Sequence, residues 1–300
     1  MESSLEFRVE DLLQRTEIYS VKKYDYTVDK LPFSKFHKLS KESNELITKV
    51  TFPEFKHQQK NVSPGSYEGG YTIWESTWIL LVFLDNIKEL NSLSVLELGS
   101  GIGVCGAFLG LKGHNVTFQD LNLNVIEKGL IPNIAMNEST AYNMDKNAIV
   151  RINLKVLYED NDKNLVHISA GFHNEKSSNS YEIVAGDWNN LVDDKTILGN
   201  FKNKFDLIIT SECIYRTENY ESIVKMVLSF MKESGRAYVA TKRFYFGLTG
   251  GTFQFLQYVK ESNFCNNYKL CGKIIKSVEP KNSSNVIDII EITKVPNVSI

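Results

Sequence analysis

Short apolar runs alternate along most of the chain with longer segments of helical periodicity. The apolar runs, each of five to seven residues, predict buried β-strands at 94–98, 115–119, 181–185, 204–210 and 235–240. The periodic segments between or beside them predict helices at 76–90, 103–112, 123–137, 218–232 and 252–261. Pro132 falls inside the third of these helices, where it predicts a kink or an early break. Alternation of this kind predicts an α/β fold with a largely parallel sheet.

The last two strand-like runs, 268–277 and 286–294, follow one another without an intervening helix. A polar turn around 280–284 connects them. Successive strands joined by a short turn pair antiparallel. We therefore expect the parallel sheet to end in a C-terminal antiparallel hairpin.

Two parts of the chain depart from this alternation. Residues 1–65 mix charges of both signs with scattered aromatic residues, and we predict an N-terminal arm, partly disordered, with a short helix near 6–15. Residues 138–180 are rich in Asn, Asp, Lys and Ser, and we predict a polar surface insertion with one added strand at 148–158. The rest of 66–300 is expected to form a single catalytic domain.

Composition narrows the functional classes. The chain has 300 residues, of which 42% are hydrophobic, so it can bury a sizeable core, and its formal charge of −2 does not favour nucleic acid as the main partner. The four cysteines show no Cys-x-x-Cys spacing, and the N-terminus resembles neither a leader nor a membrane anchor, so we expect a soluble intracellular protein. His167 and His173 have no companion Cys or His cluster, and no metal site is predicted.

The candidate chemistry starts between Val95 and Asp120. A predicted strand enters a turn with Gly99, Gly101 and Gly103, and a helix and a second strand that ends at Asp120 follow. This order is typical of a nucleotide-type cofactor site, because glycines admit a ligand close to the backbone and the acid can accept two ribose hydroxyl protons. The pattern by itself does not separate NAD from other adenosine cofactors.

Three observations favour a methyl donor over a dinucleotide. Counted from Gly99, the pattern Gly-x-Gly-x-x-Gly has Val104 where its last glycine should stand, and only a match displaced to Gly101 ends on Gly106. Glu97, just before the turn, is uncommon in dinucleotide enzymes and usual in methyltransferases, and the terminal hairpin points the same way.

The segment Glu97–Gly103 together with Asp120 resembles motif I and post-I of the seven-strand S-adenosylmethionine (SAM) methyltransferases. Within that class, five segments are similar to the eukaryotic protein-histidine methyltransferases, which modify a histidine of a large-subunit ribosomal protein: 67–77, 120–122, 131–133, 211–215 and 245–252. The matches run from about residue 64 to 261. The resemblance implies a Rossmann-like seven-stranded sheet and SAM as the cofactor.

The resemblance also implies which residues hold the cofactor. The glycines would line its methionine and ribose, Glu97 would orient the loop near the methionine amine, Asp120 would hold the ribose hydroxyls, and Asp187 and Trp188 would contact adenine. The full set implied is Trp74, Glu97, Gly99, Ser100, Gly101, Gly103, Asp120, Leu121, Asn122, Asp187, Trp188 and Ser211.

Three further residues are candidates for catalysis. The acceptor histidine, in its neutral form near pH 7, has a lone pair on one ring nitrogen that can attack the methyl group. The enzyme mainly has to hold the correct tautomer and orientation of this ring, and a carboxylate that accepts a hydrogen bond from the other ring N–H would do so. Glu212 is our first choice because it follows a predicted central strand at its carboxyl end, where open α/β sheets bind ligands. Tyr215 would help to orient the substrate, and Glu75 is a second site carboxylate. The glycines of loop 244–251 suit a peptide backbone or a hinged lid, or an ordinary flexible connection.

The leading hypothesis is therefore a SAM-dependent protein-histidine N-methyltransferase with a ribosomal protein as substrate. One alternative is a protein-lysine methyltransferase, because an acid followed three residues later by Tyr also occurs in those enzymes. Another is a cofactor-binding module without catalysis. We expect a monomer in the cytoplasm and nucleus. We expect it to bind no membrane, and to contact nucleic acid only indirectly if at all.

Overall fold

The structure, a computed structural model, describes ten stretches of the chain. These are 2–8, 18–22, 52–55, 69–87, 92–141, 149–160, 163–173, 178–265, 267–279 and 285–297. The main element of the fold is a ten-stranded sheet. A separate pair of strands, β2 (Ile18–Lys22) and β3 (Phe52–Phe55), forms a small second sheet.

Seven strands make the core of the main sheet. In spatial order they are β8 (Ser178–Ala185), β5 (Asn115–Asp120), β4 (Ser94–Leu98), β9 (Phe205–Ser211), β10 (Met231–Lys242), β12 (Ile287–Pro296) and β11 (Tyr268–Val278). The four pairings from β8 to β10 are parallel, and β12 pairs antiparallel with both β10 and β11. The predicted fold class, a mostly parallel seven-stranded sheet with a C-terminal antiparallel hairpin, is confirmed.

Three more strands extend the sheet beyond β8. They are β7 (Lys163–His173), β6 (Ile149–Asp160) and β1 (Glu2–Arg8), all paired antiparallel. The polar segment 138–180 therefore supplies two long strands and the start of a third, where the sequence predicted one. Its polar composition concealed the two-residue alternation of Val166, Ile168, Ala170 and Phe172.

The N-terminal segment also corrects an expectation. The helix predicted at 6–15 is wrong for residues 6–8, which belong to β1, and residues 9–15 lie outside the described part of the chain. Leu5 and Phe7 alternate with polar residues in the strand manner, but the run is short and its partner lies more than 140 residues away, from Ile149 to Lys155. Such a pairing has no local signal.

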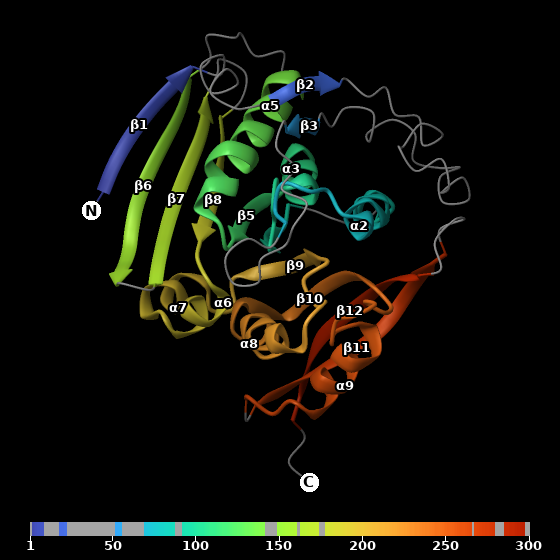
Figure 1. Cartoon of the computed structure of the whole chain (residues 1–300). Helices are drawn as coiled ribbons and strands as arrows, with labels where there is room; N and C mark the ends of the chain where they lie inside the picture. The colour runs from blue at the N-terminus through green and yellow to red at the C-terminus, as the bar shows by residue number, and fades with distance from the viewer. Residues whose placement is uncertain are drawn as a thin grey trace.

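Helices cover both faces of the sheet (Figure 1). On one side lie α2 (Glu75–Asp85), α3 (Val104–Leu111), and the continuous run of α4 (Leu123–Val125), the π-helical turn η3 (Ile126–Leu130) and α5 (Ile131–Ala141). On the other lie α6 (Trp188–Asp193), α7 (Lys195–Phe201), η4 (Thr217–Asn219), α8 (Tyr220–Phe230) and α9 (Thr252–Glu261). Two hydrophobic clusters fill the layers between the helices and the sheet. None of the described helices is long and apolar enough to cross a bilayer.

Several boundaries differ from the sequence expectation. Helix α2 was predicted at 76–90 but begins one residue earlier, at Glu75, and ends at Asp85. Residues 88–90 of the predicted helix lie outside the described ranges. Pro132 does not end the helical run, which continues through α5; the irregularity beside it is the π-helical turn η3, directly before α5. Helices α6 and α7 were not predicted.

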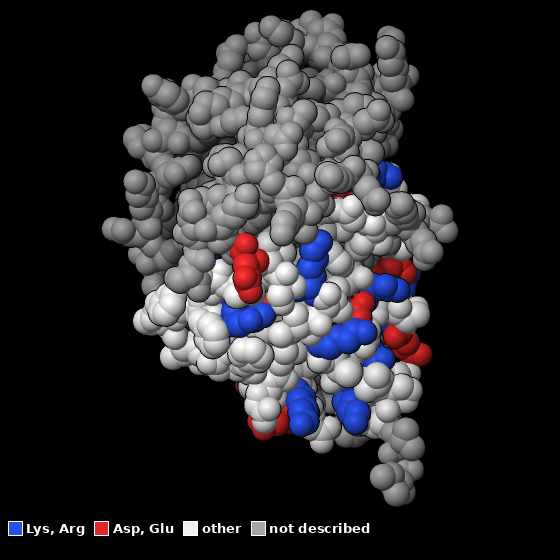
Figure 2. Space-filling view, turned by 90° about the vertical axis from the view of Figure 1, so that its right-hand side faces the viewer, with Lys and Arg blue, Asp and Glu red and all other residues white. Residues whose placement is uncertain are grey.

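Charged side chains of both signs share the face shown in Figure 2, which is the right-hand side of Figure 1. Lys and Arg lie interspersed with Asp and Glu over the described part of that face.

Candidate active site

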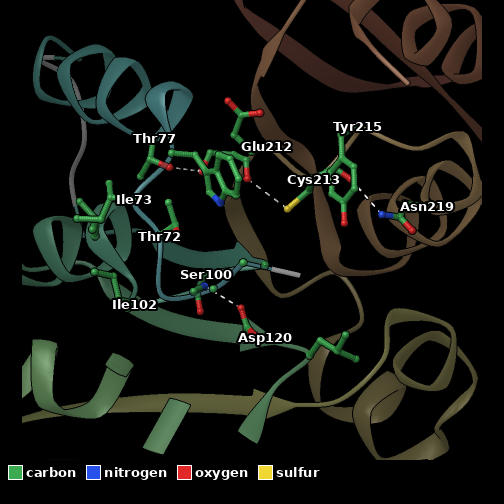
Figure 3. A pocket seen from close by; sticks show the side chains of 18 of the residues that line it. Thr72, Ile73, Thr77, Ser100, Ile102, Asp120, Glu212, Cys213, Tyr215 and Asn219 are labelled. Carbon is green, nitrogen blue, oxygen red and sulfur yellow. Dashed lines mark hydrogen bonds between the residues drawn. The ribbon is translucent and has the colours of Figure 1, made fainter. Parts of the chain in front are cut away.

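A pocket opens at the carboxyl ends of β4, β5 and β9, the edge of an open α/β sheet where ligands bind (Figure 3). Its walls come from five segments and from Asn219: 69–77, 99–104, 120–121, 186–188 and 211–216. In the view of Figure 3, Ser100 and Asp120 lie below the cavity, and Glu212 lies above it. The pocket therefore joins the glycine-rich turn to the predicted catalytic carboxylate.

The glycine-rich turn has a backbone that only glycine adopts readily. Gly99, Gly101 and Gly103 all have positive φ, at 60°, 53° and 70°. A Cβ on Gly101 would lie 2.6 Å from the carbonyl oxygen of Gly70, so the turn touches the 69–74 loop backbone to backbone. Asp120 fastens the same turn, since its Oδ2 accepts from the Gly101 N–H at 2.8 Å.

Gln119 connects three walls of the pocket and was missed by the sequence reasoning. Its Oε1 accepts from the Gly99 N–H at 3.1 Å and from the Trp188 indole at 2.5 Å, and its Nε2 donates to the Gly186 carbonyl at 2.9 Å. Gln119 thus sets the position of Trp188. A polar residue in a buried strand directly before the motif acid was the only sequence signal.

Glu97 lies beneath the turn and does not line the pocket. It is 4% exposed, and its Oε2 accepts from the Gly106 N–H in α3 at 2.8 Å. Burial raises the pKa of this carboxyl to about 8, against the backbone hydrogen bonds that lower it. In this structure the residue stabilises the junction of β4 and α3.

The raised pKa of Glu97 predicts a pH dependence of stability. The unfolded chain releases this proton near the ordinary pKa of 4.5, whereas the folded protein keeps it to about pH 8. The folded state therefore binds the extra proton between these values, and its stability falls as pH rises toward 8. We expect Glu97→Gln, which keeps an acceptor for Gly106, to remove a loss on the order of 3 kcal/mol between pH 5 and 8. Urea unfolding of both proteins at the two pH values tests this, and parallel pH profiles would contradict it.

Glu212 occupies a strained backbone position at the pocket wall. Its φ is 57°, in the left-handed region that a non-glycine residue rarely adopts, and it is 8% exposed. Its Oε1 accepts from the Ser76 hydroxyl at 2.5 Å, and its Oε2 accepts from the Tyr245 hydroxyl. Two hydroxyl donors, from α2 and from the loop after β10, therefore fix this carboxylate.

Two pocket hydroxyls have no hydrogen-bond partner among the described residues. Ser100 Oγ and Tyr215 OH are both buried, and both residues line the pocket. A buried polar atom without a partner is costly, so each hydroxyl is suited to a ligand group. They lie in the predicted cofactor region and the predicted substrate region respectively.

The pocket brings together most of the predicted site residues. Those that line it are Trp74, Gly99, Ser100, Gly101, Asp120, Leu121, Asp187, Trp188, Ser211, Glu212 and Tyr215. Glu75, Glu97, Gly103 and Asn122 do not. Glu75 opens α2, and the next residue, Ser76, is the one that reaches Glu212. Gly103 packs on Leu130 and Phe118 instead. The roles of all these residues stay predictions.

The residues present fit an adenosine-type cofactor. Gly99 and Gly101 line the pocket without side chains that would fill it, and their N–H groups are held by Gln119 and Asp120. Ser100 supplies a hydroxyl, and Asp120 and Trp188 offer a carboxylate and an aromatic ring. Within the described ranges, no group of three His, Cys, Asp or Glu side chains could hold a metal ion.

Fold and pocket together have the arrangement of a Rossmann-like cofactor-binding domain. Numbered in chain order, the core strands stand 3-2-1-4-5-7-6 across the sheet, and the glycine turn follows the first of them. A family model described as "Lysine methyltransferase" matches residues 58–163. A solved TehB-like SAM-dependent methyltransferase from Corynebacterium glutamicum aligns with a TM-score of 0.42 and 15% identity over 71% of this chain and 86% of that chain.

The particular proteins that this chain resembles are protein-histidine methyltransferases. It is 29% identical to the histidine protein methyltransferase 1 homolog of Dictyostelium discoideum over 77% of this chain and 59% of that protein. It is 33% identical to the Bos taurus homolog over 66% of this chain and 50% of that protein. The predicted resemblance is confirmed, and the chain spans only about half to three fifths of the length of these curated relatives.

Proposed function

We propose that this protein transfers a methyl group from SAM to a ring nitrogen of a histidine in a protein, specifically a large-subunit ribosomal protein. The curated relatives named for histidine methylation support the reaction, and the resemblance of the 67–77 and 245–252 segments supports the ribosomal substrate. The observation that carries the proposal is the Glu212 carboxylate, which two hydroxyls hold in the wall of a pocket shared with the glycine turn.

SAM, when bound, supplies a methyl group that its sulfonium has already activated. The backbone of Gly99 and Gly101 would hold its methionine and ribose, Asp120 would accept from the ribose hydroxyls, and Trp188 would stack on adenine. Asp120 already accepts from Gly101, so the carboxylate that receives the ribose also holds the turn in shape.

The remaining task of the protein is to present one lone pair of the imidazole. Glu212 would accept the N–H of the other ring nitrogen, which selects the tautomer and the ring orientation. Tyr245 keeps its proton for the bond to Glu212, because burial and the neighbouring carboxylate raise the pKa of its hydroxyl. Tyr215, whose hydroxyl has no partner within the described residues, is placed to contact the substrate.

Lysine is the second candidate acceptor, since the matching family model is described by that residue. A lysine ammonium must lose a proton before attack, whereas a histidine at neutral pH largely needs no deprotonation. Glu212 could accept a hydrogen bond from either acceptor, so the acceptor has to be identified chemically.

The assay is transfer of isotope-labelled methyl from SAM to purified large-subunit ribosomal proteins. We expect digestion and mass spectrometry to place the label on a histidine of one protein. Label on lysine alone would overturn the histidine proposal. Cofactor binding in calorimetry with no transfer to any protein would instead indicate a binding module.

A further inference from the structure

An exposed apolar surface surrounds the loop between β10 and α9. Phe244, Phe246 and Leu248 in the loop are 49%, 81% and 50% exposed, and Phe253 at the start of α9 is 50% exposed. These four residues, here called the apolar rim, make up four of the seven exposed large hydrophobic side chains in the described chain. The rings of Phe244 and Phe253 are 5.9 Å apart. Apolar side chains gathered in this way on a surface mark a contact site.

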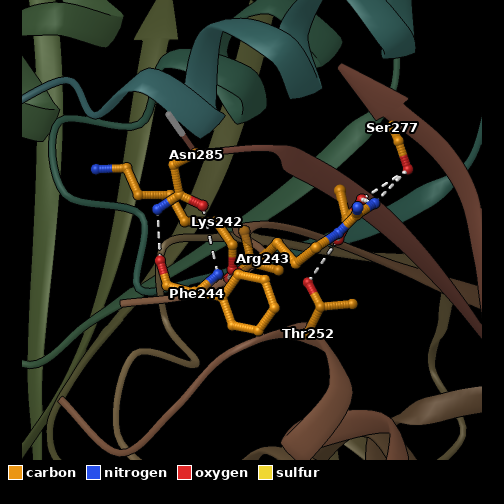
Figure 4. Close-up of polar contacts among 8 residues, drawn as sticks. Lys242, Arg243, Phe244, Thr252, Ser277 and Asn285 are labelled. Atoms are coloured by element: carbon orange, nitrogen blue, oxygen red, sulfur yellow. Dashed lines mark hydrogen bonds and ion pairs between the residues drawn. The ribbon is translucent and has the colours of Figure 1, made fainter. Parts of the chain in front are cut away.

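The base of the loop is clamped by a buried charge (Figure 4). Asp288 in β12 is fully buried and accepts two hydrogen bonds from Arg243, at 2.9 and 2.7 Å. It also accepts from the Thr252 hydroxyl at 2.9 Å, so one carboxylate holds both ends of the loop. The bonds from Arg243, Ser277 and Thr252 hold the pKa of Asp288 below its ordinary value despite burial, and the clamp stays charged at neutral pH.

The far side of the loop is fitted to the pocket wall. The Gly250 N–H donates to the Tyr215 carbonyl at 3.1 Å, and a Cβ on Gly250 would lie only 2.2 Å from the Ile214 carbonyl oxygen. The Thr249 hydroxyl accepts from the Thr217 N–H at 3.2 Å. The loop is therefore fixed against the segment that carries Tyr215 into the pocket.

The same loop presents side chains in two directions. Tyr245 is directed inward and donates to Glu212, whereas its two neighbours, Phe244 and Phe246, are exposed. None of the four rim residues lines the pocket, but the loop that carries three of them reaches the pocket wall through Tyr245 at Glu212 and Gly250 at Tyr215. The apolar rim therefore belongs to a loop that abuts the place where the acceptor is expected.

We infer that the apolar rim binds the polypeptide of the protein substrate through apolar side chains that flank the acceptor histidine. The inference rests on the proposed function and adds a requirement on the substrate sequence. Burial of exposed aromatic and leucine side chains favours association without any change in the chemistry at Glu212. The rim would therefore govern the KM for the protein substrate and leave turnover and SAM affinity alone.

The test compares three proteins in the labelled-methyl assay with purified large-subunit ribosomal proteins. The double variant Phe246→Ser/Leu248→Ser removes the two tip side chains, and Phe246→Leu/Leu248→Met keeps them apolar. Phe264→Ser is the matched control, because Phe264 is 43% exposed and lies beyond α9, outside the loop. Thermal melting verifies that all variants fold, and calorimetry gives the Kd for SAM.

We expect the serine double variant to raise KM for the protein substrate about tenfold, with kcat and the Kd for SAM within about twofold, a pattern typical of a lost binding contact. The apolar double variant and Phe264→Ser should stay close to wild type. An unchanged KM in a folded serine variant would overturn the inference and leave the proposed function intact. A wild-type protein that labels no histidine would overturn the proposed function, and the inference with it.

Discussion

Replacement of Glu212 by alanine is expected to lower kcat at least about 100-fold while the Kd for SAM stays within about threefold. The substituted enzyme would lose the acceptor for the imidazole N–H, and the ring would sample the wrong tautomer and orientation. Ser76 and Tyr245 would also lose the oxygens to which they donate. The loss of these two hydrogen bonds affects the side of the pocket where the acceptor is expected. The cofactor side is held separately, by the hydrogen bond from the Gly101 N–H to Asp120, so SAM affinity should change little.

The matched control is Glu218→Ala, which removes an exposed carboxylate from η4 in the same stretch of chain. We expect its kcat to remain within about twofold of wild type. Single-turnover rates with labelled SAM, measured beside calorimetric Kd values, separate chemistry from binding. Equal turnover in Glu212→Ala and wild type would show that the catalytic assignment of Glu212 is wrong.

The second large effect is expected at Gly101. An alanine there would need a positive φ of 53° and would place its Cβ 2.6 Å from the Gly70 carbonyl oxygen, where the neighbour is backbone and cannot rotate away. The 69–74 loop would have to move away from the turn, which would open one wall of the pocket. We expect Gly101→Ala to raise the Kd for SAM at least about 30-fold and to destabilise the fold by about 1–3 kcal/mol.

Gly113→Ala provides the control for backbone strain alone. Gly113 also has a positive φ, of 88°, but a Cβ there would meet no atom within 4 Å. This variant should lose about 1 kcal/mol of stability and bind SAM as wild type does. Calorimetry with urea unfolding measures both quantities. Equal SAM affinity in the two variants would mean that the contact between Gly101 and Gly70 does not shape the pocket.

The features that the sequence predicted well are those with local signals. Each of these signals can be recognised from a few neighbouring residues: the apolar runs of strand length, the glycines in the turn and the acid at the end of β5. The structure places all of them as expected. Glu212 was expected at the pocket for a similar reason, since it directly follows a central strand, and it does line the pocket. The αL backbone of Glu212 was not predicted, because no glycine or asparagine marked it.

The features that were missed depend on partners far away in the chain. Ser76 and Tyr245 meet at Glu212 from positions separated from it by 136 and 33 residues. Glu75, chosen from the sequence as a second site carboxylate, does not line the pocket, and its neighbour Ser76 is the residue that donates to Glu212. One position along a helix turns a side chain by about 100°, which the sequence pattern did not resolve. Strands β1 and β7 were missed for the same reason, since their pairing is set by the assembled sheet, whereas the strand predicted at 148–158 is β6.

The position of β1 has a practical consequence for anyone who shortens this chain. Residues 2–8 pair with Ile149 to Lys155 of β6, so β1 takes the place of β6 as the edge strand of the sheet. A chain cut before residue 66 would leave a β6 backbone of up to 12 residues with open donors and acceptors along that side. That edge would be longer than the seven-residue β1 edge it replaces and a larger template for intermolecular strand addition, so we expect loss of the N-terminal segment to promote aggregation.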